Sequence, residues 1–259
     1  MKQESFDIFG YIVIVKFQKG VTAGAKKKFA DKFLKENKSV KTVLEKTGKF
    51  SGRLRKQKTK YIAGEKTKEA LYRENGCVFR LNVDDVYFSS RLSNERKEIA
   101  KKVKNGDKVL VMFAGAAPYP IVIARDSRAK VVYSNEINRE ANKYAELNIG
   151  LNKVNGRVVL LPGDIKRVAQ KVKEKFDVIV MPRPQLKDMF LREAFSLSKK
   201  GTRIYYYDFC KEDEIKGIVN KIKSEALKSK KKIKILKIKK AGEIAPYRFR
   251  IRVDFEVLG

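Results

Sequence analysis

Short apolar runs alternate with amphipathic stretches through the middle of the chain, from residue 108 to residue 208. The apolar runs predict β-strands at residues 108–114, 130–135, 157–162, 176–181 and 202–208. The stretches between them have apolar side chains at helical spacing and predict helices near residues 117–126, 138–150, 165–173 and 187–198. Strands that alternate with helices in this way are parallel neighbours joined by right-handed crossovers. The sequence therefore predicts an α/β fold with a doubly wound sheet.

The pattern changes on both sides of this alternating region. Before it, the segment that begins at Ser93 predicts a helix that ends before Gly106. After it, residues 211–229 predict a helix and residues 232–238 predict a strand. The final run, YRFRIRVDFEV from Tyr247, predicts a strand that pairs antiparallel within the sheet.

The first part of the chain places β-rich and helical segments close together. Residues 5–17 are mostly apolar and predict a hairpin, or a buried strand broken near Gly10. Residues 23–46 place apolar side chains between lysines at helical spacing, which predicts one or two amphipathic helices. An Asn75-Gly76 pair inside a mixed basic and apolar stretch predicts a β-hairpin. The expected domains are a small α+β unit and the sheet domain, at residues 1–70 and 71–259.

Composition indicates a polyanionic partner and excludes several kinds of site. The chain has 61 Lys and Arg against 30 Asp and Glu, and its formal net charge of +31 favours nucleic acid. No membrane partner is expected, since we find no long apolar span, signal peptide or lipidation motif. Two cysteines are too few for a zinc knuckle or a disulfide framework, so we expect a reducing cytoplasm and no metal. Because the chain has no histidine, acid–base chemistry must use carboxylates, lysine or positioning alone.

The ends of the first three strands of the predicted sheet carry the residue types of a nucleoside site. The first strand is followed by the small-residue turn 114–117, where a ligand can approach the backbone. Glu136 follows the second strand, roughly 20 residues later, where doubly wound nucleotide binders keep an acid for ribose hydroxyls. Asp164 follows the third strand. The turn alone also fits a tight helix–strand contact, and Glu136 alone fits a partner of a helix dipole.

The turn lacks the G-x-G-x-x-G pattern of dinucleotide binders. A pyrophosphate needs several free backbone amides at a helix N-terminus. S-adenosylmethionine carries no phosphate and needs only room at the turn and acceptors for its hydroxyls. We therefore expect S-adenosylmethionine, rather than NAD, as the cofactor.

Four segments of the chain carry a resemblance to one enzyme family. They are VYFSSRLSNERKEIA, MFAGAAPYP, YSNEINREANKYAELNIGLNKV and LLPGDIKRV. Together they resemble the archaeal and eukaryotic tRNA guanine-37 N1-methyltransferases and their wybutosine-pathway relatives. The resemblance extends to FDIFGYIVIVKF, GRLRKQKTKYIAGE and EIAPYRFRIRVDFEV, and so covers nearly the whole chain. The family's separate N-terminal domain, which grips the tRNA elbow, is expected to be absent.

The resemblance implies a Rossmann-like class I methyltransferase sheet, S-adenosyl-L-methionine as cofactor and tRNA as substrate. We expect a monomer that acts in the cytoplasm. The implied cofactor-binding residues lie at the three strand ends and are Phe113, Ala114, Gly115, Ala116, Glu136, Ile137, Asp164 and Ile165. The implied substrate-binding residues are Arg91, Pro182, Arg183 and Pro184.

The methylation of guanine N1 makes two demands on a catalytic site. The N1 proton must leave, and negative charge then develops on O6, so the site needs a base and a cation or hydrogen-bond donor. The resemblance implies that Glu95 is the general base and that Arg55 faces O6. Without the resemblance, Glu95 also fits a first-turn acid in a helix capped by Ser93. Arg55 alone also fits a phosphate contact.

The chain departs from the family's pattern at three places. Pro182 replaces an asparagine after the fourth strand, Val111 replaces an acid ahead of the turn, and Ala116-Ala117 replaces Val-Gly. These departures leave two other functions open, namely methyl or aminocarboxypropyl transfer in the wyosine pathway and tRNA binding without catalysis. The SRLSNER segment argues against aminocarboxypropyl transfer. In the strand IYYYDF, which begins at Ile204, we expect one or two tyrosines to stack on the target base.

Overall fold

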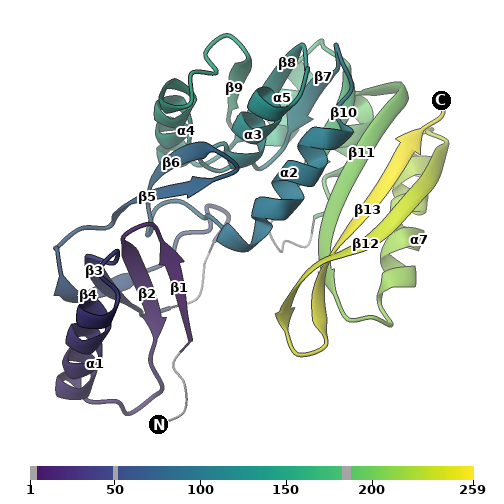
Figure 1. The fold of residues 1–259 in the computed structure, drawn as a ribbon. Coiled ribbons are helices and arrows are strands. Elements are labelled where there is room, and N and C mark those ends of the chain that lie inside the picture. Colours follow the sequence, from purple (N-terminus) through teal and green to yellow (C-terminus); the bar gives the residue numbers. More distant parts are fainter. Residues whose placement is uncertain (1–4, 49–51, 183–187) are drawn as a thin grey trace. The chain divides into compact units, whose positions relative to one another are not determined.

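The computed structural model describes residues 5–48, 52–182 and 188–259 (Figure 1). The chain forms two compact units, Met1–Ser90 and Arg91–Gly259. Each unit has its own sheets and its own buried apolar residues, so each is described separately.

The N-terminal unit is built on a four-stranded sheet in the order β1-β2-β3-β4. The strands are β1 (Ser5–Phe9), β2 (Ile12–Lys16), β3 (Thr42–Lys46) and β4 (Thr59–Gly64). β1 and β2 pair antiparallel, which confirms the hairpin predicted at residues 5–17. Its turn needs a glycine, because Gly10 has φ +60° and an added Cβ would lie 2.0 Å from the Leu71 carbonyl oxygen.

Residues 23–46 form one helix and one strand, so the prediction of a second helix was wrong. The helix α1 (Ala23–Glu36) begins at Thr22, whose hydroxyl accepts from the Ala25 amide. The last five residues, 42–46, form β3, which pairs parallel with β2 and antiparallel with β4. Val43 and Leu44 are fully buried there, so sheet pairing overrides the helical spacing of the apolar residues.

The predicted hairpin at Asn75-Gly76 is present and belongs to the N-terminal unit. It joins β5 (Glu69–Glu74) to β6 (Cys77–Asn82), and both turn residues have positive φ, as a two-residue hairpin turn requires. The ring of Phe9 packs edge-on against Tyr72 and Phe88, with centroids 6.5 and 6.3 Å apart. These contacts hold the hairpin to the first sheet, and the compact unit therefore extends to Ser90.

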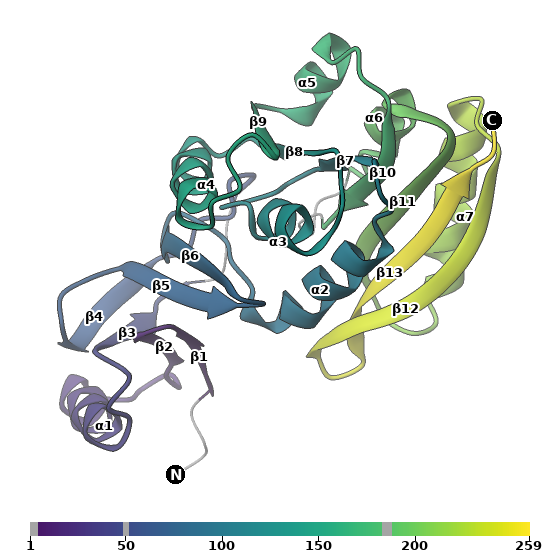
Figure 2. The same ribbon diagram turned by 45° about the horizontal axis from the view of Figure 1, so that its top comes forward.

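The C-terminal unit contains a seven-stranded sheet in the order β12-β13-β11-β10-β7-β8-β9 (Figures 1 and 2). Neighbours from β11 to β9 pair parallel, whereas β13 pairs antiparallel with β11 and β12. The predicted doubly wound α/β sheet with an antiparallel C-terminal strand is thus confirmed. The strands are β7 (Lys108–Val111), β8 (Val131–Glu136), β9 (Val158–Pro162), β10 (Phe176–Met181), β11 (Ser198–Cys210), β12 (Ile233–Ala245) and β13 (Arg248–Val257).

Helices cover both faces of this sheet (Figure 2). One face carries α2 (Ser93–Lys102), α3 (Pro118–Asp126) and α4 (Arg139–Leu151). The other carries α5 (Ile165–Lys171), α6 (Leu191–Ser196) and α7 (Ile215–Lys228), which share one apolar core with the sheet. The helix predicted at 187–198 is shorter than expected, because α6 begins at Leu191 and β11 already begins at Ser198.

Candidate functional site

The backbone after β7 bends sharply at a turn of small residues. Phe113, Gly115 and Ala117 have φ values of +58°, +58° and +64°, so alternate residues of the turn are left-handed. The Ala114 amide donates to the Asn135 carbonyl at 2.9 Å, which ties the turn to the end of β8. Left-handed backbone at residues other than glycine is costly and occurs often at ligand sites. The turn therefore has the strained backbone that is typical of a ligand site.

Glu136 fastens the same turn from the end of β8. Its Oε2 accepts from the Gly115 amide at 2.8 Å, and its Oε1 accepts from the Asn138 amide at 2.8 Å. Burial raises the pKa of Glu136, although hydrogen bonds from these backbone amides oppose the rise. A carboxylate offers about four acceptor positions, so these two bonds leave acceptors for the hydroxyls of a ligand. The side chain fits the ribose of a nucleoside.

The end of β9 joins the same group of residues. The Gly163 amide donates to the Glu136 carbonyl at 2.8 Å. Asp164 begins α5, and its Oδ1 accepts from the Lys166 amide at 3.1 Å. Ile165 is buried and Ile137 is half-buried, so both can offer apolar contact beside the carboxylates. The ends of β7, β8 and β9 thus bring the predicted cofactor residues together.

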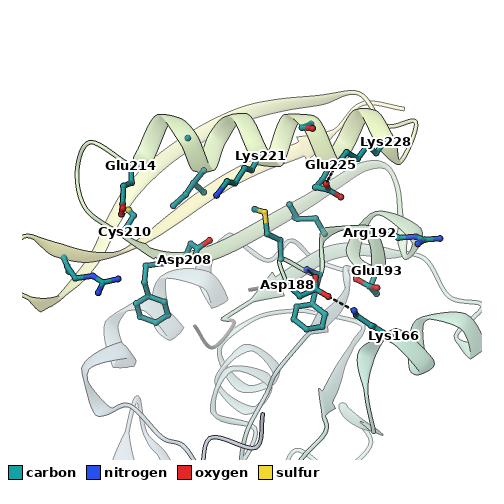
Figure 3. A pocket seen from close by; sticks show the side chains of 18 residues that line it. Lys166, Asp188, Arg192, Glu193, Asp208, Cys210, Glu214, Lys221, Glu225 and Lys228 are labelled. Carbon is teal, nitrogen blue, oxygen red and sulfur yellow. Dashed lines mark hydrogen bonds and ion pairs between the residues drawn. The ribbon is translucent and has the colours of Figure 1, made fainter. Parts of the chain in front are cut away.

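A cleft of about 980 Å³ lies between α7 and the segment that leads into α6 (Figure 3). Lys166 forms an ion pair with Asp188 at 2.5 Å in its wall. Phe190, next to Asp188 in the chain, contacts the ring of Phe113 with a centroid distance of 5.0 Å. The cleft therefore adjoins the turn after β7. Burial raises the pKa of Cys210, which also lines the cleft, to about 11, so its thiol stays protonated at neutral pH.

Glu95 lies on α2 and is held by three cationic or phenolic donors. Its Oε2 accepts from Arg252 Nη1 at 2.7 Å and from the Tyr207 hydroxyl at 2.9 Å, and its Oε1 accepts from Lys239 Nζ at 2.5 Å. Only 5% of Glu95 is exposed. The ring of Tyr207 lies 6.2 Å from that of Tyr119, which follows the turn at the start of α3. Glu95 is therefore connected to the turn through two aromatic side chains.

The other predicted site residues are spread over both units. Arg55, in the N-terminal unit, is half-buried with φ +54°, and its guanidinium lies 5.2 Å from the ring centre of Tyr87. Arg91 is exposed in a short 3₁₀ helix, Ser90–Leu92. Pro182 directly follows β10 and is half-buried, while Arg183 and Pro184 lie outside the described residues. The roles of these residues stay predictions.

Two expectations about individual residues change with the structure. The three tyrosines at 205–207 are buried, with at most 4% exposed, so they do not offer an open stacking surface. Val111 is fully buried in β7, opposite Val180 and Ser134 in the neighbouring strands. A valine at this place completes the apolar centre of the sheet.

Sequence reasoning missed the charged partners of Glu95 on β12 and β13. Arg252 and Asp254 are buried, and Arg252 Nε donates to Asp254 Oδ1 at 2.6 Å. The signal was available, because charged residues alternate with apolar ones along the last strand. Charges at every second position of a buried strand indicate an ionic contact with the element above that face.

The described residues hold no cluster of three or more His, Cys, Asp or Glu side chains that could bind a metal ion. In the same part of the chain, none of the helices combines the length and apolar character needed to span a lipid bilayer.

Comparison with known proteins identifies the family. A profile described as the TRM5/TYW2 methyltransferase domain matches residues 70–236, and one described as the TYW2 N-terminal domain matches residues 2–67. The tRNA (guanine(37)-N(1))-methyltransferase Trm5b of Pyrococcus abyssi is 36% identical over 98% of this chain and 74% of its own length. Its crystal structure gives a TM-score of 0.87 and covers 98% of this chain and 75% of that one.

Two further archaeal proteins are similar over nearly the whole chain. The tRNA (guanine(37)-N(1))/4-demethylwyosine(37)-methyltransferase Taw22 of Nanoarchaeum equitans is 34% identical over 98% of this chain and 100% of its own length. The structure of Methanocaldococcus jannaschii Trm5 in complex with adenosine has a TM-score of 0.82 at 27% identity and covers 98% of this chain and 74% of that one. The chain therefore belongs to the TRM5/TYW2 methyltransferase family.

Proposed function

We propose that this protein is an S-adenosylmethionine-dependent tRNA methyltransferase that methylates guanosine 37 at N1. One observation carries the proposal. The turn after β7 and the Glu136 carboxylate are joined at 2.8 Å, in a chain that aligns over 98% of its length with a named enzyme of this activity. The proposed setting is the cytoplasm, with the protein acting as a monomer.

The ends of β7, β8 and β9 are the proposed cofactor site. Glu136 would accept from the ribose hydroxyls, because its two carboxylate oxygens retain acceptor positions beyond the bonds from Gly115 and Asn138. The proposed remaining contacts come from Phe113, Ala114, Ala116, Ile137, Asp164 and Ile165. When bound, S-adenosylmethionine supplies an electrophilic methyl group. The residues of the chain then have to position the RNA base and remove its proton.

Glu95 is the proposed general base for the N1 proton, and Arg55 is the proposed donor to O6. No histidine is available for either task, which leaves carboxylates as the natural bases. The proposed contacts to the RNA come from Arg91, Pro182, Arg183 and Pro184, the last two outside the described residues. A tRNA partner is supported by the large positive charge of the chain, +31, and by the names of its relatives.

A second candidate is methylation of 4-demethylwyosine at the same position of tRNA. Two observations favour it. The relative from Nanoarchaeum equitans is named for both activities, and the chain has Pro182 where the resemblance implies an asparagine that cradles the base. The same cofactor site and the same tRNA position serve both reactions.

Calorimetry and one substitution test the proposal. S-adenosylmethionine should bind with measurable heat, and no heat at millimolar ligand would argue for a protein that only binds tRNA. Glu95→Gln should lower turnover by about 10²-fold or more with little change in tRNA affinity, since general-base contributions are of that order. The matched control is Glu146→Gln on the exposed face of α4, which should leave turnover unchanged. Full activity in Glu95→Gln would remove Glu95 from the mechanism.

A further inference from the structure

Arg252 stands at the centre of a buried ionic cluster between α2 and the last two strands. Its guanidinium is fully buried and contacts three carboxylates. Nη1 donates to Glu95 at 2.7 Å, Nη2 to Glu98 at 2.7 Å and Nε to Asp254 at 2.6 Å. A buried guanidinium bonded on all its edges has one orientation, because any rotation would leave a carboxylate without its donor.

The two carboxylate oxygens of Glu95 accept different numbers of hydrogen bonds. Oε2 accepts from both Arg252 and Tyr207, which uses its two lone pairs. Oε1 accepts from Lys239 at 2.5 Å, which leaves one acceptor position on that oxygen. Burial raises the pKa of Tyr207 well above its ordinary value, so the phenol stays protonated and continues to donate to Oε2. Oε1 is therefore the oxygen with room for another proton.

We propose that Arg252 and Lys239 are positioning residues of the general base, and that Glu95 Oε1 is the atom that takes the proton from the RNA base. This inference rests on the proposed function. In the step, the N1–H bond of guanine breaks and an O–H bond forms at Oε1. The bonding electron pair stays on N1, which becomes the nucleophile for the methyl group.

The two cations have different parts in this arrangement. Arg252 is fully buried and fixes the direction of the carboxylate. Lys239 reaches in from the edge strand β12, and 33% of its side chain is exposed. It also contacts Glu98. Because Lys239 shares Oε1 with the incoming proton, its charge opposes protonation of that oxygen. Arg252 thus sets the geometry of the base, and Lys239 holds one acceptor position of the oxygen that receives the proton.

Several other charged or titratable groups belong to the same cluster, either bonded to Glu95 or linked to it through the residues that it contacts. They are Arg96, Glu98 and Lys102 on α2, Tyr119 on α3, Tyr207 on β11, Lys239 on β12, and Arg252 and Asp254 on β13. Burial raises the pKa of Tyr119 to about 12. Burial also raises the pKa of Glu98, but hydrogen bonds from Arg252 and Lys239 outweigh it and lower the value to about 2. Both groups therefore keep one charge state through the neutral range.

The first test compares Lys239→Met with Lys240→Met in the full-length protein. Lys240 is the adjacent residue on β12, and it pairs with Glu212 and lies over Phe249. For Lys239→Met, the midpoint of the acid limb of the kcat profile should move to higher pH by about one unit, as loss of a neighbouring cation predicts. The KM for tRNA should change little. Lys240→Met should follow the wild type. A loss of rate that is equal at every pH would overturn the role of Lys239.

The second test does not depend on catalysis. Carboxyl ¹³C resonances of labelled glutamate are titrated by NMR in the protein without cofactor, and the Glu95 signal is assigned by its loss in Glu95→Gln. Its midpoint should also move upward in Lys239→Met. An unmoved midpoint would overturn the inference. A moved midpoint in a protein that forms no N1-methylated guanosine would leave the cluster as described and refute the proposed function instead.

The third test concerns orientation. Arg252→Lys keeps the charge but cannot hold three carboxylates in fixed directions. It should lower kcat by about tenfold or more at the pH optimum, with KM for tRNA unchanged, because small errors in placement cost rate steeply. Circular dichroism establishes that the variant is folded. Wild-type kcat in folded Arg252→Lys would overturn the role of Arg252, and an unfolded variant leaves the Lys239 measurements to decide the inference.

Discussion

Ala117 is a residue held in a conformation that alanine disfavours. It has φ +64°, precedes α3 and is fully buried. Left-handed backbone costs a residue with a Cβ roughly 1–2 kcal/mol. In Ala117→Gly, relief of this strain offsets the cost of a glycine and of a lost buried methyl, so the free energy of unfolding measured by urea denaturation should stay equal to the wild type or rise by up to about 1 kcal/mol.

The neighbouring Ala116 supplies a matched control. It is equally buried but does not have positive φ. Ala116→Gly should lower the stability by about 1 kcal/mol, because it adds freedom to the unfolded chain and removes a buried methyl. If Ala117→Gly destabilised the protein as much as Ala116→Gly, strain at Ala117 would be refuted.

Glu136 is expected to control nucleoside affinity in a pH-dependent way. Glu136→Gln removes a charged acceptor and should weaken binding of S-adenosylhomocysteine by roughly 10- to 100-fold, as lost bonds to a charged group predict. Burial raises the pKa of Glu136, so the wild-type affinity should fall at a higher pH than an ordinary carboxyl would allow, as the carboxylate takes up its proton.

Calorimetry at several pH values checks this dependence. The control is Glu140→Gln, at the start of α4, where the carboxylate pairs with exposed Lys143. That variant should bind like the wild type at each pH. Equal affinity of wild type and Glu136→Gln at neutral pH would contradict a ribose contact.

The location of a residue in the site was predictable where it follows directly from the residue's position at the end of a strand. Glu136 follows a strand at a fixed distance from the turn, and the structure joins the two. The alternating charges of β13 indicated an ionic contact for Arg252, but they did not indicate that two of its three partners lie on α2. A partner on a distant element is set by packing, which one chain's local pattern does not encode.

At the scale of elements, α2 is held against β12 and β13 by ion pairs between side chains as well as by apolar packing. Glu98 contributes to this contact through Arg252 and Lys239. Burial raises its pKa, but those hydrogen bonds lower it from 4.5 to about 2. A carboxyl group whose pKa is lower in the folded protein than in the unfolded one stabilises the fold when the pH is above the unfolded-state pKa. This stabilisation is lost as the pH falls through the folded-state pKa.

Glu98→Gln should therefore unfold at lower urea concentration than the wild type at pH 7. The gap should shrink as the pH falls from 4.5 toward 2, the interval between the two pKa values of Glu98. Glu146→Gln, on the exposed side of α4, should show no gap at any pH. A gap that stays constant down to pH 2 would show that Glu98 does not stabilise the fold through its charge.

Helices and strands were predicted best in the part of the chain where a β-strand followed by a helix is repeated. The strands and helices from residue 108 to residue 181 lie within a few residues of their predicted bounds. The error at 42–46 has a physical reason, since lysines beside valine and leucine satisfy helical spacing and a half-buried strand equally well. Pairing with β2 and β4 then decides the outcome.

At the scale of the whole molecule, the positive charge predicts binding that depends steeply on salt. Several exposed lysines make no ion pair within the described residues, namely Lys230, Lys232, Lys234 and Lys237. The logarithm of the tRNA association constant should fall linearly with the logarithm of salt concentration, by a slope of about 0.7–0.9 per neutralised phosphate. A triple change of Lys232, Lys234 and Lys237 to Gln should reduce that slope. A flat salt response in the wild type would contradict a polyanionic partner.

The division of the chain into compact units was harder to anticipate than the fold. Composition changes little across residues 60–90, and the contacts that bind the β5–β6 hairpin to the first sheet, such as those of Phe9 with Tyr72 and Phe88, join residues far apart in the chain. Contacts between residues that are far apart in the sequence cannot be predicted from local sequence patterns. The alternation that predicts the doubly wound sheet is local and needs no such information.

The most direct test of the account is the identity of the nucleoside that the protein forms. An unmodified tRNA transcript with guanosine at position 37 is incubated with the protein and S-adenosylmethionine, digested and separated by liquid chromatography with mass spectrometry. A transcript with adenosine at that position serves as the control. The expected product is a guanosine with one added methyl group that co-elutes with 1-methylguanosine and is missing from the control. Unchanged guanosine, or an increment the size of an aminocarboxypropyl group, would contradict it.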